Sequence, residues 1–205
     1  LCINACLGKS GKKALEFGEA TYETQDYADK MFKEHKNPEI FDRFTLKGAS
    51  LRKPCFEFSG ACAGCGETPY LKMLSQLFGE KLVIANATGC SSIYGGSAPS
   101  TPYLIPWANS LFEDNAEFGY GMYLTYKNTQ KRIRDIIAKS IDCVSEDVKE
   151  LLNKWLENET NYDITKEIVD KLQTMEIPKD IKDILEYMVA RSVFIVGGDG
   201  WAYDI

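Results

Sequence analysis

Two cysteines, Cys62 and Cys65, form a C-x2-C pair within a run of small residues. Ala63 and Gly64 between them allow the backbone to turn tightly enough to present both sulfur atoms to one metal centre. Backbone amides freed in such a loop can also bond the sulfides of an iron–sulfur cluster. Cys90 lies in a second loop of small residues after an apolar run, and it is a candidate third ligand.

The spacing of this pair by itself leaves three other interpretations open: half a zinc site, a redox dithiol or a chance pairing. The zinc site lacks an obvious histidine partner, because the single histidine, His35, lies in a charged helical stretch and is expected to be solvated. The redox dithiol lacks the usual aromatic residue and proline. The seven cysteines are odd in number and unevenly spaced, which argues against a disulfide framework. Cys55 and Cys143 match no ligand position, and both are expected to be buried apolar thiols.

A third candidate is the tripeptide Gly198-Asp199-Gly200, which follows an apolar run. The glycines would let the main chain approach phosphate oxygens, and Asp199 offers the hard carboxylate oxygen that Mg²⁺ prefers. Ligands of α/β sheets bind at the ends of strands, where this tripeptide is expected. A structural turn that happens to contain an aspartate remains the alternative.

Short apolar runs and helical stripes indicate how these loops are positioned. Runs at 82–85 and 193–196 are typical of buried strands, and residues 13–17 fit a brief strand. Helices between apolar strands predict an α/β fold with a parallel sheet flanked by helices.

Helix-capping residues and apolar stripes in the sequence predict where the helices lie. Thr68 as N-cap and Pro69 as first helical residue predict a helix over 70–78 that Gly79 closes. Further helices are expected over 24–36 and over about 117–141, and Ser145 is expected to cap a helix that carries the apolar stripe of 148–156. Two further stripes, at 164–175 and 181–188, also predict helices, and we interpret all three stripes as core packing.

Composition excludes several classes of protein. The chain has 205 residues, with 24 basic and 30 acidic side chains and a net charge of -6, and the basic residues are scattered, so nucleic-acid binding is disfavoured. No apolar run approaches the roughly 20 residues that a membrane span needs, and the first residues do not resemble a signal peptide. We expect an intracellular protein. Because the sequence starts without Met and stops just after a strand-like run, we also expect an internal fragment.

Three long motifs together resemble the C-terminal region of the pyruvate:ferredoxin (and flavodoxin) oxidoreductases, in wording and in order. They are FEFSGACAGCGETPY at 56–70, IANATGCSSIY at 84–94 and GGDGWAYDI at 197–205. The resemblance covers roughly residues 51–205, and the helices of 145–188 are its least distinctive part. It implies an incomplete thiamine diphosphate-binding fold.

The resemblance implies a role for each site residue. Cys62, Cys65 and Cys90 would be three ligands of the proximal 4Fe-4S cluster beside thiamine diphosphate, with the fourth supplied from outside this sequence. Glu67 and Cys90 would contact the cofactor, and the residues that would hold its diphosphate are Gly198, Asp199, Gly200 and Trp201, with Asp199 on Mg²⁺.

The first cysteines extend the resemblance upstream. Cys2 and Cys6 fit the last two cysteines of a ferredoxin-type C-x2-C-x2-C-x3-C run, although Leu7 stands where that motif usually has proline. The implied organisation is the end of a ferredoxin-like iron–sulfur domain at 1–16, a linker at 17–50, and the N-terminal part of a thiamine diphosphate-binding domain at 51–205.

The reaction that the resemblance implies is the oxidative decarboxylation of pyruvate with coenzyme A to acetyl-CoA and CO₂. Electrons would pass from thiamine diphosphate through the clusters to ferredoxin or flavodoxin. The family also implies a homodimer, placed in the cytoplasm or, alternatively, in hydrogenosomes. A non-catalytic iron–sulfur or metal-binding electron carrier is the rival hypothesis: it explains the cysteines but leaves the motif at 197–205 without a role.

Overall fold

The computed structural model describes residues 2–19, 21–38, 40–97, 100–198 and 201, and it divides the chain into two compact units, Leu1–Asn37 and Pro38–Ile205. The first unit holds the short helix α1 (Cys2–Ala5), the 3₁₀ turn η1 (Lys9–Gly11) and helix α2 (Tyr22–Glu34). Thr21 caps α2 by accepting a hydrogen bond from the amide of Thr24. The helix predicted over 24–36 is thus present, two residues earlier, and His35 after it is exposed as expected.

The brief strand predicted over 13–17 was wrong, because those residues form neither helix nor strand. Leu15 is 50% exposed and Phe17 is 94% exposed, so no apolar layer covers this run. A short strand without a pairing partner leaves its backbone hydrogen bonds to water, and it is not stable alone.

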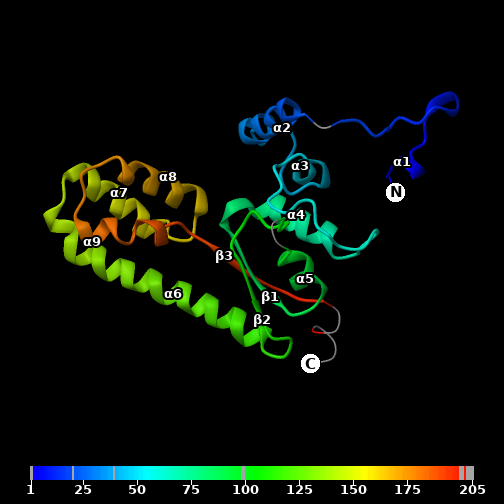
Figure 1. The fold of residues 1–205 in the computed structure, drawn as a ribbon. Helices are drawn as coiled ribbons and strands as arrows, with labels where there is room; N and C mark the ends of the chain where they lie inside the picture. The colour runs from blue at the N-terminus through cyan, green and yellow to red at the C-terminus, as the bar shows by residue number, and fades with distance from the viewer. Residues whose placement is uncertain (1, 20, 39, 98–99, 199–200, 202–205) are drawn as a thin grey trace. The chain divides into compact units, whose positions relative to one another are not determined.

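The second unit is an α/β structure built on a three-stranded parallel sheet (Figure 1). Its strands are β1 (Leu82–Ala87), β2 (Trp107–Ser110) and β3 (Ser192–Val196), in the order β2-β1-β3. Its helices and 3₁₀ turns are α3 (Leu46–Ser50), α4 (Thr68–Phe78), η2 (Gly79–Lys81), α5 (Cys90–Gly95), α6 (Asn115–Ser140), η3 (Ile141–Cys143), α7 (Glu146–Glu157), α8 (Tyr162–Gln173), α9 (Lys179–Lys182) and η4 (Leu185–Tyr187). The predicted α/β class is confirmed, as are the two predicted strands, whereas β2 was not predicted.

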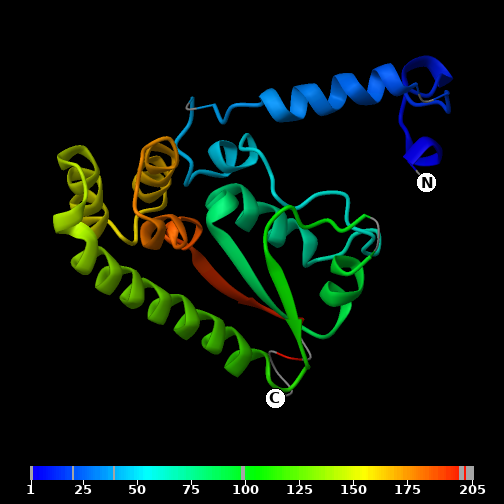
Figure 2. The same ribbon diagram turned by 60° about the vertical axis from the view of Figure 1, so that its left-hand side comes forward.

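Side chains of β1 alternate between two packed faces of the sheet. Leu82 and Ile84 join a core cluster with Leu71 of α4 and Tyr94 of α5. On the opposite face, Ala85 lies against α6, and Figure 2 shows the strands between α4 and α5 on one side and the long α6 on the other. Since both faces are covered, the strand reads as a nearly continuous apolar run.

Helix α4 begins one residue earlier than its sequence signals predict. Thr68 is the first helical residue, Pro69 lies in the first turn, and Glu67 takes the N-cap position without a capping bond from its side chain. At the other end, Gly79 closes the helix at φ +59°, a left-handed conformation that favours glycine. The helix start therefore places Glu67, not Thr68, at the junction with the C-x2-C loop.

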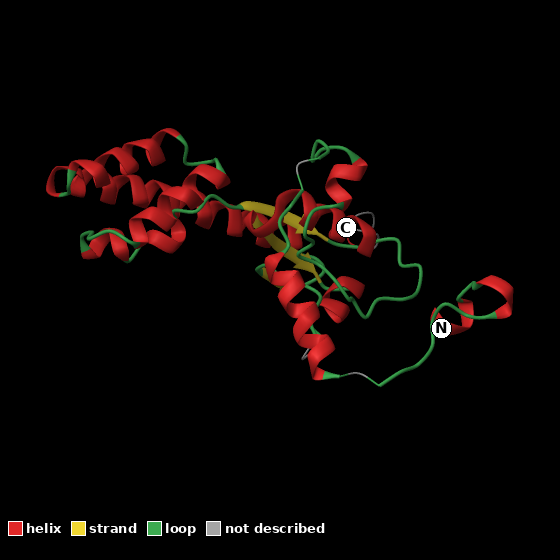
Figure 3. Cartoon of the chain, turned by 90° about the horizontal axis from the view of Figure 1, so that it is seen from above, coloured by secondary structure: helices red, strands yellow, loops and turns green. Residues whose placement is uncertain are grey.

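A second core lies among α6, α7, α8 and α9, beyond the end of the sheet at which β3 begins (Figure 3). Trp155 is fully buried there, and its Nε1 donates to the carbonyl of Met188 at 2.8 Å. The apolar stripes pack into this core, as predicted, except that Leu156 is 37% exposed. The stripe after Pro178 is divided between α9 and η4 and does not form one helix. No helix in the described part of the chain is both long and apolar enough to cross a membrane.

Gly119 of α6 sets how closely this helix approaches the sheet. A Cβ at this position would lie 2.4 Å from Cγ1 of Ile195 and 3.2 Å from Cβ of Ala85. We expect Gly119→Ala to lower the free energy of unfolding by about 1–3 kcal/mol, because overpacking outweighs the gain in helix propensity. Chemical denaturation measures this change.

Gly121→Ala is the matched control, because a Cβ there would meet nothing within 4 Å. It should stabilise the same helix by about 0.5–1 kcal/mol. Equal effects of the two substitutions would contradict the close packing of α6 on the sheet.

Candidate functional site

Two of the predicted site loops leave neighbouring strands at the same edge of the sheet. In the parallel register, Asn86 near the end of β1 lies opposite Val196 at the end of β3. The loop to Cys90 follows β1, and Gly197 follows β3. A Cβ on Gly197 would lie 2.6 Å from Cε3 of Trp201 and 3.2 Å from Cβ of Ala87, so the absence of a side chain is required. The carboxyl edge thus gathers two motifs that are far apart in the sequence.

A pocket of about 480 Å³ lies between α4 and β3 beside this edge, and both Glu67 and Trp201 line it. Its remaining lining residues are Tyr70, Leu71, Met73, Leu74, Leu77, Phe194, Ile195, Val196 and Gly197. Two of the residues predicted to contact a cofactor are therefore brought to one pocket. Gly198 is exposed and Asp199 and Gly200 lie outside the described residues, so their roles stay predictions.

The carboxylate of Glu67 is buried at one oxygen and has no partner there. Oε1 makes no hydrogen bond with the described protein atoms. The local backbone explains this: Pro69 has no N–H, and the amide of Tyr70 donates to the carbonyl of Glu67 at 3.1 Å. The backbone N–H groups of Thr68 and Glu67 act on the sulfur of Cys65 and lower its pKa. Neither Pro69 nor Tyr70 therefore offers an amide to this oxygen, and a ligand that brings a donor could satisfy it.

Two buried phenols face Glu67. The hydroxyls of Tyr94 and Tyr103 have no hydrogen-bond partner among the described protein atoms. Burial raises the pKa of both phenols, and the negative charge of Glu67 raises the pKa of each further. Both therefore stay protonated, as neutral donors, at physiological pH.

Aromatic packing holds these phenols in place. Phe56 lies edge-on to Tyr94 and to Tyr103, with ring centroids 6.0 and 5.0 Å away, and Tyr103 stacks on Trp107 at 5.1 Å. Phe56 and Tyr103 also form an antiparallel bridge. The segment before the C-x2-C loop is thereby tied to the segment before β2. Sequence reasoning missed both tyrosines, although the aromatic residues around the motif were a usable signal.

Cys62 and Cys65 share one tight turn, as their small neighbours predict. The amide of Cys65 donates to the carbonyl of Cys62 at 3.0 Å, and Gly64 has φ +75°. Cys62 and Cys90 are exposed and Cys65 is half-buried. Within the described ranges, no three His, Cys, Asp or Glu side chains are gathered closely enough to hold a metal ion, so Cys90 is not brought into one group with the pair.

The donor set nevertheless suits a cluster. Backbone amides of Thr68 and Glu67 hold the pKa of the Cys65 thiol below its ordinary value, which favours the thiolate that binds iron. The contrast is Cys55, which is buried as expected and whose pKa is raised by that burial. Cys143 is exposed, so the prediction that it is a buried thiol was wrong: it ends the 3₁₀ turn η3 after α6, outside the core.

The other predicted cluster cysteines lie in the first unit. Cys2 is exposed in α1, and Cys6 is half-buried directly after it. Their assignment to a ferredoxin-type cluster stays a prediction.

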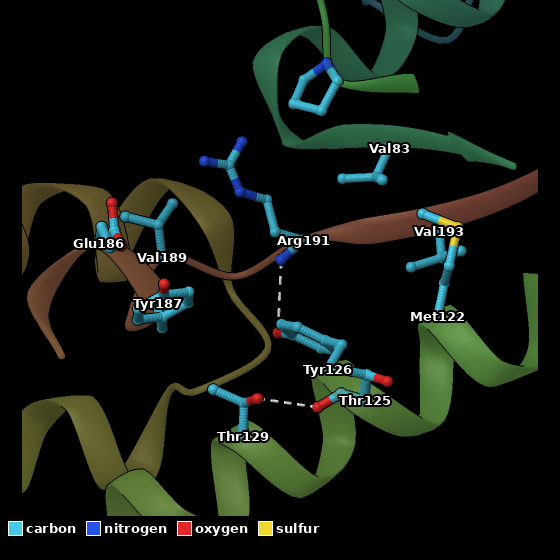
Figure 4. Close-up of a pocket in the computed structure, with 11 residues that line it drawn as sticks. Val83, Met122, Thr125, Tyr126, Thr129, Glu186, Tyr187, Val189, Arg191 and Val193 are labelled. Atoms are coloured by element: carbon cyan, nitrogen blue, oxygen red, sulfur yellow. Dashed lines mark hydrogen bonds between the residues drawn. The ribbon is translucent and has the colours of Figure 1, made fainter. Parts of the chain in front are cut away.

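A second pocket, of about 510 Å³, lies at the opposite end of the strands (Figure 4). Arg191, which precedes β3, lies in its wall with Val83 and Tyr126, and its amide donates to the Tyr126 hydroxyl at 3.3 Å. Its guanidinium already donates to the carbonyl of Glu80 at 2.6 Å. Because open α/β sheets bind ligands at the carboxyl ends of their strands, the pocket beside Glu67 is the better candidate.

The lowered pKa of Cys65 can be measured in protein prepared without iron. A thiol with a depressed pKa is deprotonated at lower pH, so alkylation of Cys65 should reach its maximal rate at lower pH than alkylation of Cys55. Mass spectrometry of the alkylated peptides follows both sites. Thr68→Val removes one hydroxyl hydrogen bond that lowers this pKa and should move the Cys65 profile to higher pH. Coinciding profiles for Cys65 and Cys55 would refute the arrangement of amides around Cys65.

No family model matches the chain, but individual proteins do. The pyruvate:ferredoxin oxidoreductase of Moorella thermoacetica is 46% identical over 192 residues, which cover 82% of this chain and 16% of that protein. A pyruvate-flavodoxin oxidoreductase of Klebsiella pneumoniae is 42% identical over 100% of this chain and 19% of its own length. A pyruvate dehydrogenase [NADP(+)] of Cryptosporidium parvum is 38% identical over 100% of this chain and 13% of its own length.

The chain thus spans less than a fifth of the length of these relatives. Its parallel sheet with flanking helices is consistent with part of a thiamine diphosphate-binding fold in a large oxidoreductase. Identity of 38–46% over most or all of the chain is far above chance resemblance. The chain belongs to the family of pyruvate:ferredoxin and pyruvate-flavodoxin oxidoreductases, of whose members it matches one segment.

Proposed function

We propose that this chain is part of an oxidoreductase that decarboxylates pyruvate oxidatively. With coenzyme A, pyruvate would yield acetyl-CoA and CO₂, and its two electrons would reduce two one-electron acceptors, ferredoxin or flavodoxin. The names of the relatives support pyruvate as the substrate. The single observation in the structure that carries the proposal is the pocket at the sheet edge, which Glu67 and Trp201 from two separate motifs both line.

The cofactor set follows from the donors present. Thiamine diphosphate, when bound, supplies the electron sink that decarboxylation of a 2-oxoacid needs. Glu67 offers an unpaired buried oxygen, and Gly198, Gly200 and Trp201 belong to the segment that would hold the diphosphate, with Asp199 as the ligand of Mg²⁺.

The chain's own residues would orient and protect the reactive group. Tyr94 and Tyr103 remain neutral beside Glu67, so neither phenol adds a second negative charge next to that carboxylate. Leucines of α4 and residues of β3 form an apolar wall on one side of the pocket. Glu67 would thus accept a hydrogen bond from the bound group at Oε1.

Cysteines of the chain would provide the route for electrons. Cys62, Cys65 and Cys90 would be ligands of a 4Fe-4S cluster, with Cys90 also against the cofactor, and Cys2 and Cys6 would be ligands in a ferredoxin-type module. The amides around Cys65 support this role, because hydrogen bonds to cluster sulfurs tune the reduction potential.

We propose a ferredoxin-like end at 1–16, a linker at 17–50 and a thiamine diphosphate-binding part at 51–205, in a cytoplasmic or hydrogenosomal homodimer. The similarity to pyruvate dehydrogenases [NADP(+)] makes NADP⁺ the alternative final acceptor.

The test compares Cys65→Ser with Cys143→Ser in the complete oxidoreductase that contains this segment. Pyruvate- and coenzyme-A-dependent reduction of a low-potential dye is measured without oxygen, together with iron content. We expect Cys65→Ser to lose at least about 100-fold in rate and part of the iron, because removing a ligand thiolate uncouples the first electron acceptor. Cys143→Ser, an exposed cysteine without a proposed role, should match the wild type.

Two results would count against the proposal. Full activity in Cys65→Ser would remove the cluster assignment. Iron in the wild type without any pyruvate-dependent reduction or bound thiamine diphosphate would instead favour a non-catalytic iron–sulfur electron carrier.

A further inference from the structure

Side chains at the carboxyl ends of the three strands form a continuous chain of hydrogen bonds. The hydroxyl of Thr88, two residues before Cys90, donates to the carbonyl of Ser110 at 2.6 Å. The hydroxyl of Ser110 lies 3.0 Å from Oδ1 of Asn115 and 3.1 Å from the carbonyl of Leu111, so its one proton is shared between these two acceptors, and Nδ2 of Asn115 donates to the carbonyl of Val196 at 3.1 Å. The chain therefore runs from the loop before Cys90 to the last residue of β3.

A second branch ties in the central strand. Nδ2 of Asn86 donates to Oδ1 of Asn109 at 3.1 Å and to the carbonyl of Ala87 at 2.9 Å, and Nδ2 of Asn109 donates to Thr88 Oγ1 at 3.1 Å. Asn86 is fully buried, and its Oδ1 has no partner among the described protein atoms. An amide is costly to bury, so packing alone does not account for an asparagine here.

Asn115 connects strands that the sheet itself does not connect. In the order β2-β1-β3, β2 and β3 are not neighbours, so no backbone hydrogen bonds join them. Asn115 bridges from Ser110 of β2 to Val196 of β3 with its two amide atoms, and it is itself 0% exposed. A buried amide that is bonded at both its oxygen and its nitrogen restricts the arrangement of the groups that it joins.

We propose that Asn115 is a positioning residue, which fixes the end of β3, and therefore Gly197 and the start of the diphosphate-binding segment, relative to the loop that carries Cys90. The inference rests on the proposed function and adds to it a residue outside the three family motifs. The hydrogen bond from Asn115 to the carbonyl of Val196 fixes the position of the backbone at the edge of the pocket. Through Ser110 and Thr88, the same amide sets the spacing between the diphosphate segment and the cluster ligand.

The test measures binding of thiamine diphosphate with Mg²⁺ by calorimetry in the complete oxidoreductase, independently of turnover. We expect Asn115→Ala to raise the dissociation constant about tenfold, equivalent to about 1.4 kcal/mol. Ser110→Ala should raise it about threefold. Because the two side chains act in series, the double variant should bind no more weakly than Asn115→Ala alone.

Two controls separate positioning from general stability. Ile137→Val trims the buried core among α6 to α9, so it should lower the unfolding temperature without changing the dissociation constant. Asn158→Ala removes another bond from an asparagine to a carbonyl, to Lys154 O at 2.9 Å, and should also leave it unchanged.

Each outcome decides a different point. The positioning role would be overturned if the dissociation constants of Asn115→Ala and Ser110→Ala both lay within twofold of the wild-type value. It would also be overturned if Ile137→Val raised the dissociation constant as much as Asn115→Ala does. If Asn115→Ala fails to fold, Ser110→Ala decides: a change of twofold or more supports the role, and a smaller change overturns it. A wild type that binds no thiamine diphosphate would sink the proposed function, and the inference with it.

Discussion

The parallel pairing of β1 with both β2 and β3 is the constraint on which the candidate site depends. Parallel strands must be joined by long crossovers, so the loops that leave their carboxyl ends come from distant parts of the chain. Asn86 stands opposite Asn109 on one side and Val196 on the other. This register alone brings the Cys90 loop, the polar end of β2 and Gly197 to one edge. A slip of one residue would turn each of these groups to the opposite face.

Elements with strong local signals could be predicted from the sequence, and elements made by tertiary pairing could not. Apolar runs located β1 and β3, and Pro69 with Gly79 bounded α4 to within one residue. Strand β2 escaped prediction because Trp107–Ser110 has no alternation and little burial. This segment forms a strand because its backbone pairs with that of β1. The run at 13–17 had strand composition but no such partner.

The candidate site also has parts that could be predicted from the sequence and parts that could not. Motif composition located the turn of Cys62 and Cys65, because small residues are a local signal, whereas a role for Glu67 was implied only by the family resemblance. The surroundings of Glu67 could not be predicted from the sequence. Tyr94 and Tyr103 reach it only because Phe56 pairs with Tyr103 across a gap in sequence and packs against both rings. Asn115 was missed for the same reason, since its partner Val196 lies on another strand.

The backbone at the start of α4 affects two functional groups, the carboxylate of Glu67 and the thiol of Cys65. A carboxylate at an N-cap ordinarily accepts a bond from the first turn, which would occupy it. Here Pro69 removes one donor and the amide of Tyr70 donates to the carbonyl of Glu67, while the backbone N–H groups of Thr68 and Glu67 lower the pKa of Cys65. The same few residues therefore stabilise a thiolate and leave a carboxylate oxygen unpaired beside it. In the sequence, Thr68 and Pro69 signal the start of a helix. In the structure, this helix start leaves an oxygen of Glu67 available to a ligand.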